Sequence, residues 1–234
     1  MKLFALKARL SVTLSLAVVA GSATFAQAPS GGSPTSINTA FVKLFGSVGA
    51  FTAKAEAQVF DRSQKETVRM PMDFALLDGK VRLEIDMAQM QAKDLPPNTL
   101  AALKQAGMDR VISIFRPDKK TNYVLYPSIQ SYSGVPFDKG EAEVSEKSLT
   151  LEKTALGKYT IDGHACVQNK VVVKNGQTPV FEAVTWNAAD LKDFPLQIEI
   201  REKLTTVRMR FNQVRLVKLD AQQFDVPAKY SLVQ

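Results

Sequence analysis

Residues 68–87, VRMPMDFALLDGKVRLEIDM, have the pattern of two strands joined by a tight turn, and this pattern is the clearest indication of the fold. Every second residue is apolar from 68 to 76 and again from 81 to 87. Between the two runs, Asp78-Gly79 is a dipeptide typical of a two-residue hairpin turn. Alternation with period two predicts half-buried antiparallel strands, with one face on the core and the other in water.

Similar alternating segments recur through the chain after this hairpin, and short turns separate most of them. They cover residues 111–116, 122–126, 158–161, 166–173, 180–186, 196–200, 207–211 and 214–219. Asp162-Gly163 and Asn175-Gly176 supply two of the turns. With the first hairpin they predict about ten strands in one large curved antiparallel sheet. The fold class is therefore mainly β with some helix (α+β), an unclosed β-barrel with an apolar concave face.

Two helices are expected early in the chain. The first has apolar residues at helical spacing: Ile37, Ala40, Phe41, Leu44 and Phe45. Ser36 suits its N-cap and Gly46 suits its end. The second is PPNTLAALKQAG, residues 96–107, which starts with prolines and ends at a glycine. A sheet that curls must fill its hollow, since an empty apolar cavity loses packing energy, so we expect these helices to act as a lid or plug.

The N-terminus predicts export. Three basic residues precede an apolar run at residues 10–20, and Ala26-Gln27-Ala28 places small residues where a signal peptidase cuts. We expect a signal peptide over residues 1–28, cleaved after about Ala28, with cleavage after Ala26 as the alternative. The apolar run is shorter than the roughly 20 residues that span a bilayer, so no stable transmembrane anchor is expected. The protein is then periplasmic or secreted.

After the leader we expect a flexible lead-in at residues 29–35 and a single domain over residues 36–234. The leader holds three of the 30 Lys and Arg residues and none of the 23 Asp and Glu residues, so the net charge falls from +7 to +4 without it. A charge this modest, without aromatic residues among the basic ones, does not indicate nucleic-acid binding. A single cysteine excludes an internal disulfide.

His164 and Cys166 are the residues that most invite a catalytic hypothesis. Two positions apart on a strand, they project to one face, as a thiol–imidazole pair or two metal ligands would. A structural metal site needs four ligands, however, and the chain has no other histidine or cysteine. We therefore interpret Cys166 as a small buried hydrophobe, and predict no catalytic residue, no metal and no cofactor. An enzyme using both residues is the least favoured alternative.

The apolar face of the first hairpin suggests a ligand cavity. Met70, Met72 and Met87 carry adaptable side chains that suit varied apolar ligands, although they fill an irregular core equally well. From the alternation, the residues expected to line the cavity are Phe74, Leu83, Ile85, Ile198 and Met209.

Four segments carry a resemblance to a known family: RPDKKTNYVLYPSIQSY, TALGKYTIDGHACV, DLKDFPLQIEI and FDVPAKY. With the leader and the order of elements, they resemble the LolA/LolB-type lipoprotein-carrier superfamily, and within it an exported bacterial family. The resemblance implies an unclosed β-barrel capped by helices, with a hydrophobic cavity that holds acyl chains in characterised relatives. Relatives of this fold include carriers, lipoproteins and sensors of envelope stress, so the fold alone does not select a function.

Alternation and resemblance together lead to one expectation and one main alternative. The expectation is an exported, non-enzymatic protein that binds a lipid, an acyl chain or another apolar ligand in the concave face. The alternative is a periplasmic envelope-interaction or stress-sensing module, in which the protein's own side chains fill the hollow and an envelope protein is the partner.

Overall fold

The structure is a computed structural model that describes residues 34–137, 146–201 and 204–233. The signal peptide, its cleavage site near Ala28 and residues 29–33 of the lead-in fall outside the described residues. The first helix starts at Pro34, two residues before the expected N-cap at Ser36, so the end of the expected lead-in is helical.

The described residues form two α-helices and thirteen strands. The helices are α2 (Pro34–Lys43) and α3 (Thr99–Gln105). The strands are β1 (Ala50–Phe60), β2 (Glu66–Leu77), β3 (Lys80–Asp86), β4 (Gln91–Ala92), β5 (Arg110–Arg116), β6 (Thr121–Tyr126), β7 (Ser131–Pro136), β8 (Leu149–Ile161), β9 (His164–Asn175), β10 (Thr178–Ala188), β11 (Phe194–Arg201), β12 (Thr206–Arg215) and β13 (Ser231–Leu232). Short 3-10 helices include Ala189–Leu191 and Ala221–Phe224.

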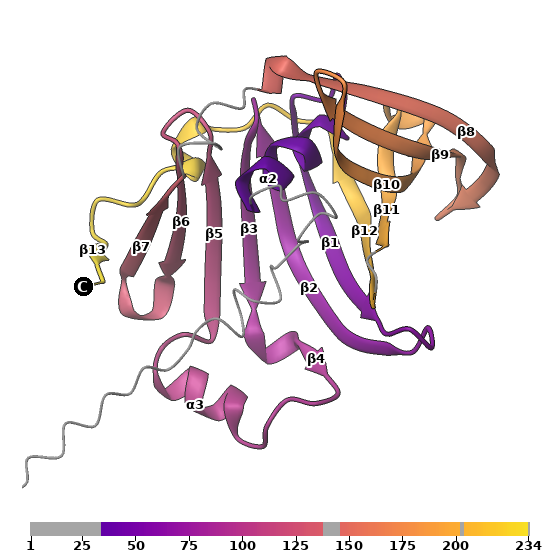
Figure 1. The fold of residues 1–234 in the computed structure, drawn as a ribbon. Helices are drawn as coiled ribbons and strands as arrows, with labels where there is room; N and C mark the ends of the chain where they lie inside the picture. The colour runs from indigo at the N-terminus through magenta and orange to yellow at the C-terminus, as the bar shows by residue number, and fades with distance from the viewer. Residues whose placement is uncertain (1–33, 138–145, 202–203, 234) are drawn as a thin grey trace, which may run out of the picture.

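All thirteen strands belong to one sheet that curves but does not close (Figure 1). Their order is β13-β7-β6-β5-β3-β2-β1-β12-β11-β10-β9-β8, and β4 pairs with β2 off this path. The pairings are antiparallel except for the two-residue parallel contact of β13 with β7. In the described residues β8 and β13 end the sheet without pairing to each other. The predicted fold class, an unclosed barrel with helices, is confirmed.

The concave face of the sheet is apolar and much of the convex face is charged. On β2, Phe74 lies in the concave core and is 2% exposed. Its neighbour Asp73 lies on the other face and forms an ion pair with Lys54 of β1 at 2.5 Å. The alternation in the sequence therefore separates the core from the solvated face, as expected for antiparallel strands.

One phenylalanine plugs the half of the hollow that lies beneath α2. Phe45, in the turn that follows α2, is 1% exposed. Its ring centroid lies 4.9–5.7 Å from five others: Phe41, Phe51, Phe74, Phe194 and Phe211. Where β1 passes beneath this cluster it carries small residues, Ala53 and Ala55. Their short side chains leave space for the rings. The first helix thus acts as a plug in this half.

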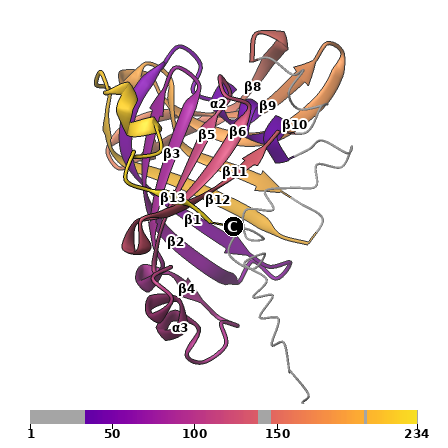
Figure 2. The same ribbon diagram turned by 90° about the vertical axis from the view of Figure 1, so that its left-hand side faces the viewer.

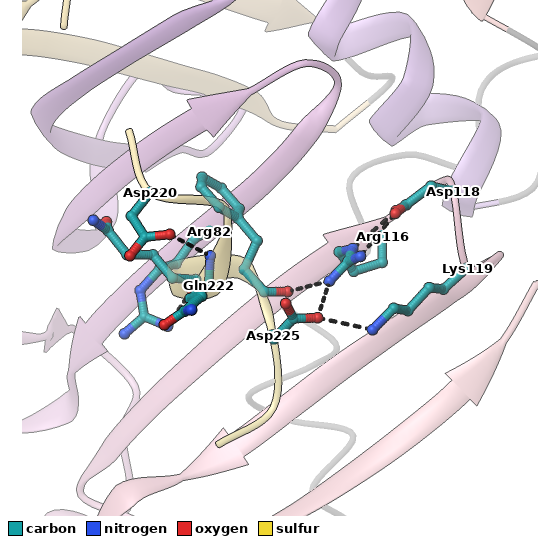
Figure 3. A network of polar contacts seen from close by, with 9 residues as sticks. Arg82, Arg116, Asp118, Lys119, Asp220, Gln222 and Asp225 are labelled. Atoms are coloured by element: carbon teal, nitrogen blue, oxygen red, sulfur yellow. Dashed lines mark hydrogen bonds and ion pairs between the residues drawn. The ribbon is translucent and has the colours of Figure 1, made fainter. Parts of the chain in front are cut away.

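The C-terminal strap, residues 216–230, covers the convex face. Figure 2 shows it on the opposite side of the sheet from α2. Its anchor is Phe224, which is fully buried in a second apolar cluster with Ile112, Ile114 and Leu125. A polar network fixes the segment next to this anchor (Figure 3). Arg116 donates a hydrogen bond to the Phe224 carbonyl at 2.8 Å.

The same arginine binds two carboxylates. Arg116 pairs with Asp225 of the strap at 2.5 Å and with Asp118 at 2.7 Å, and Lys119 also reaches Asp225 at 2.8 Å. These hydrogen bonds, strengthened by the opposite charges, raise the pKa of Arg116 and lower the pKa of both carboxyl groups. Two of the segments that carry the family resemblance, RPDKK and FDVP, therefore meet in this network.

Some expected strand limits are wrong. The strand expected at 214–219 does not form, because β12 ends at Arg215 and the chain leaves the sheet as the strap. The strand expected at 158–161 is the end of the thirteen-residue β8, and β1, β4, β7 and β13 were not expected. Between β10 and β11 the chain makes a single 3-10 turn, Ala189–Leu191.

Candidate ligand site on the concave face

The half of the concave face next to α3 is apolar but incompletely covered. We call this surface the apolar mouth. Its residues come from β2, β3, β5, α3 and the flanking turns, and each packs against the main core while staying half-buried: Met70, Leu83, Met90, Leu100, Met108 and Val111. Figure 1 shows α3 at the end of the sheet where β3 finishes and β5 begins. A ligand that covered the mouth would remove apolar surface from water, worth about 25 cal/mol per Å².

Methionine is concentrated in this core. The chain has seven methionines. Every one except Met1 lies in the main cluster, which is the apolar core on the concave face, or packs against it. Met70 of β2 and Met209 of β12 flank Ala57 of β1 in register. Unbranched thioether side chains adapt to irregular shapes, so the methionines of the apolar mouth can pack against ligands of different shape.

The structure brings all five residues of the predicted cavity to one face. Phe74, Ile85, Ile198 and Met209 are at most 9% exposed and belong to the main cluster, and the half-buried Leu83 packs against it. Phe74 lies on the plugged side, where its ring stacks on Phe51 with centroids 5.4 Å apart. Contact of a ligand with these five residues stays a prediction.

His164 and Cys166 lie on β9, but their side chains have different partners. The His164 Nδ1 atom is 2.6 Å from Asp190 Oδ2. Cys166 is 2% exposed, and its thiol donates to the His164 backbone carbonyl at 3.5 Å. Burial raises the pKa of the thiol, with the carboxylates of Asp190 and Asp162 adding to the effect. A thiol held protonated is a poor nucleophile.

Two further findings concern the described residues only. They contain no group of three or more His, Cys, Asp and Glu side chains placed to hold a metal ion. No helix among them combines the length and the apolarity needed to cross a membrane.

A separate cleft of about 330 Å³ lies on the convex face beside the strap. Charged and polar residues make up most of its lining, including Lys54, Asp73, Arg82 and Arg215. Such a lining suits a hydrated surface more than an apolar ligand. The candidate site is therefore on the concave face.

The fold and the apolar mouth together define a class: an unclosed β-barrel with helices at its concave side and an apolar concave surface. No family model matches the chain, and no curated protein matches it either. Solved structures do match, among them the LolA superfamily protein NE2245 from Nitrosomonas europaea, with 9% identity, coverage of 78% of this chain and 93% of that chain, and a TM-score of 0.37.

Two mycobacterial proteins match in the same way. The lipoprotein LppX of Mycobacterium tuberculosis has 10% identity, coverage of 76% of this chain and 95% of that chain, and a TM-score of 0.38. LprF of Mycobacterium bovis has 10% identity, coverage of 85% and 98%, and a TM-score of 0.38. Because these TM-scores lie below 0.5, the account of the fold rests on the strand pairing of this chain.

Sequence reasoning missed part of the site. Met90 and Met108 lie in turns on either side of α3, where no periodic pattern marks them as inward-facing. Leu100 lies within the second expected helix, and its three-residue spacing from Leu103 is the signal that marks an apolar side there. The strap network was missed because Arg116 and Asp225 are distant in sequence and no spacing rule links them.

Proposed function

We propose that this protein is an exported, non-enzymatic binding protein that holds a lipid or another apolar ligand on the concave face of its sheet. The ligand lies against the apolar mouth, between the sheet and α3, while α2 and its phenylalanine cluster fill the other half. The leader over residues 1–28 supports a location in the periplasm or outside the cell.

The observation that carries this proposal is the half-buried state of the apolar mouth. Large apolar side chains on a concave surface are usually covered, either by the protein's own residues or by a ligand. In the plugged half the cover is Phe45 with its neighbouring rings, and all of these except the half-buried Phe41 are at most 2% exposed. At the mouth, Met70 and Leu83 remain half-buried on the same face of the sheet.

The assignment as a non-enzyme is supported by the pair at the start of β9. Nucleophilic catalysis requires a base within reach of the nucleophile and a thiol that ionises easily. Cys166 is buried with a raised pKa, and the His164 ring nitrogen Nδ1 is engaged by Asp190. The pair therefore serves packing and local structure in this proposal.

A charge placed in the mouth tests the proposal. Leu83→Lys and Met70→Lys each put an ammonium group on the proposed binding surface. The matched control is Val172→Lys, which replaces a half-buried aliphatic residue on the convex face of β9, where Glu152 and Glu182 are its register partners. Binding is measured with a fluorescent long-chain acyl probe, and folding of each variant by thermal unfolding.

We expect both mouth variants to weaken probe binding by at least about tenfold, since burial of an unpaired charge costs several kcal/mol. The control variant should bind like the wild type. Unchanged binding by folded Leu83→Lys and Met70→Lys proteins would contradict the proposal.

A second candidate function follows from the plugged half. Because the phenylalanine cluster fills that part of the hollow, the protein also fits an envelope-interaction module that acts through its outer surface. This candidate predicts a ligand-free protein that forms a stable complex with a periplasmic protein, detectable by crosslinking in intact cells. An acyl-probe affinity that depends on Leu83 would argue against it.

A further inference from the structure

The concave face continues past the apolar mouth onto β5, β6 and β7, which follow β3 in the sheet (Figure 1). In register, Leu83 of the mouth pairs with Ser113 of β5. Val124 of β6 pairs with Ser113 on one side and with Ser133 of β7 on the other. All four residues are half-buried, so solvent reaches each of them in part. This row therefore extends the mouth, as one accessible surface, as far as β7.

Hydroxyl and amide groups dominate this extension of the concave face. Asn122 and Tyr126 lie two positions on either side of Val124 along β6, so alternation places them on the same face. Ser131 shares the face with Ser133 for the same reason. Four of these polar residues are half-buried, and Tyr126 is 5% exposed. We call the set the neutral strip: Ser113, Asn122, Tyr126, Ser131 and Ser133.

Two members of the neutral strip have side chains that are not used by the protein itself. In the part of the chain that the structure describes, neither the Ser113 hydroxyl nor the Asn122 side-chain amide makes a hydrogen bond. By contrast, Ser131 donates to the Ile129 backbone carbonyl at 3.1 Å. A half-buried polar group without a protein partner keeps its hydrogen bond to water, or exchanges it for one to a ligand. Ser113 is the closer of the two to the mouth, since it adjoins Leu83 in the register.

The described residues of β5, β6 and β7 bring no charged side chain to the concave face. Residues 121–137, which include β6 and β7, contain no Asp, Glu, Lys, Arg or His. The two arginines of β5, Arg110 and Arg116, form their ion pairs on the convex face. Burial raises the pKa of Tyr126, so its phenol is uncharged near neutral pH. The neutral strip therefore offers hydrogen bonds without a counter-charge.

We propose that the ligand is an amphiphile with an uncharged head group that carries hydroxyl or ester oxygens, bound with its chain in the apolar mouth and its head on the neutral strip. The inference rests on the proposed function and adds the class and the orientation of the ligand. Ser113 and Asn122 form hydrogen bonds with the head, while Leu83 contacts the chain. An ionised head on this surface would lose water without gaining an opposite charge, which disfavours anionic lipids.

The experiment compares two probes with the same acyl chain, a monoacylglycerol and the ionised fatty acid, as ligands of the purified protein. Ser113→Ala removes the hydroxyl next to the mouth, and Ser47→Ala is its control, since Ser47 is exposed in the turn before β1. Val124→Lys places an ammonium group within the neutral strip. Val172→Lys, which places one on the convex face, is the control for this charge. Thermal unfolding checks that each variant is folded.

We expect the wild type to bind the monoacylglycerol about tenfold more tightly than the fatty acid. Ser113→Ala should weaken binding of the monoacylglycerol about fivefold, because one neutral hydrogen bond is lost, and leave binding of the fatty acid unchanged. Val124→Lys should reverse the preference, since its ammonium group pairs with the carboxylate. Both controls should behave like the wild type. The Ser113→Ala result decides the test if Val124→Lys does not fold.

Three outcomes contradict the inference in distinguishable ways. Binding of the fatty acid as tight as that of the monoacylglycerol by the wild type would overturn the neutral strip as a head-group site and leave the apolar mouth intact. Binding of the monoacylglycerol that is unchanged in Ser113→Ala, with its preference kept in Val124→Lys, would show that the head lies elsewhere. Binding of neither probe would contradict the proposed function itself, together with this inference.

Discussion

At the scale of single residues, Phe45 determines how much of the concave face is closed. It leaves the end of α2 and enters a cluster of phenylalanine rings contributed by β1, β2, β11 and β12. Removal of a buried phenylalanine side chain leaves a cavity that the surrounding sheet cannot fill.

We predict that Phe45→Ala lowers the free energy of unfolding by about 3–5 kcal/mol, measured by chemical denaturation. Val135→Ala, at a position that is 60% exposed, is the control and should change this free energy by about 0.5 kcal/mol or less. A loss below about 1 kcal/mol for Phe45→Ala would show that α2 does not plug the hollow.

Cys166 offers a second test at this scale. Because burial raises the pKa of its thiol, we expect iodoacetamide to react slowly with the native protein at about pH 8 and to completion after denaturation, as intact mass would show. Fast labelling of the native protein would instead indicate an accessible thiolate. It would also revive the alternative in which Cys166 acts with His164.

At the scale of elements, the strap is the segment whose attachment depends on ionised groups. Hydrogen bonds from Lys119 and Arg116 lower the pKa of Asp225. An unfolded aspartate titrates near 3.8, so the folded group has the lower pKa. Its contribution to stability is present above the unfolded pKa and is lost as the pH falls through the folded pKa.

We therefore predict that the free energy of unfolding falls as the pH is lowered from about 5 toward 2, and that Asp225→Asn makes this fall shallower. Asp118, whose pKa Arg116 also lowers, keeps part of the dependence in the variant. Asp94→Asn, at an exposed position outside the ion pairs of the described residues, is the control. An identical pH profile for wild type and Asp225→Asn would contradict this account of the strap.

The elements also show what the sequence could predict. The hairpin of β2 and β3 was predicted correctly, because the alternation and the Asp78-Gly79 turn agree, and both residues adopt the positive φ that this turn needs, 47° and 81°. The strand expected at 214–219 was wrong for a physical reason. Leu216 and Leu219 are partly buried by packing against the two clusters, and an alternating pattern reports burial, not pairing.

The candidate site was predictable only where periodicity applies. Leu83 and Ile85 were assigned to the concave face, because the alternation along β3 fixes their direction. The ion pair of Lys153 with Asp193 was not predicted, because no spacing rule links β8 with the turn before β11. Asn169 and Thr185 look like ordinary polar residues within β-strands until the register places them in one row.

At the scale of the whole molecule, the two halves of the concave face have different roles. Under α2 the protein fills its own hollow with aromatic side chains, which stabilises the open sheet. Next to α3 it leaves methionine and aliphatic side chains half-buried. The strap covers the convex face behind β2, β3 and β5, so that part of the sheet is packed on both sides. A stable scaffold thereby presents one incompletely covered apolar surface.

The most direct test of this account is native mass spectrometry of the protein purified from a periplasmic extract without detergent, followed by organic extraction and lipid analysis. We predict a stoichiometric apolar adduct that is lost in Leu83→Lys and kept in Val172→Lys. A clean ligand-free mass that stays unchanged after incubation with lipids would contradict the account.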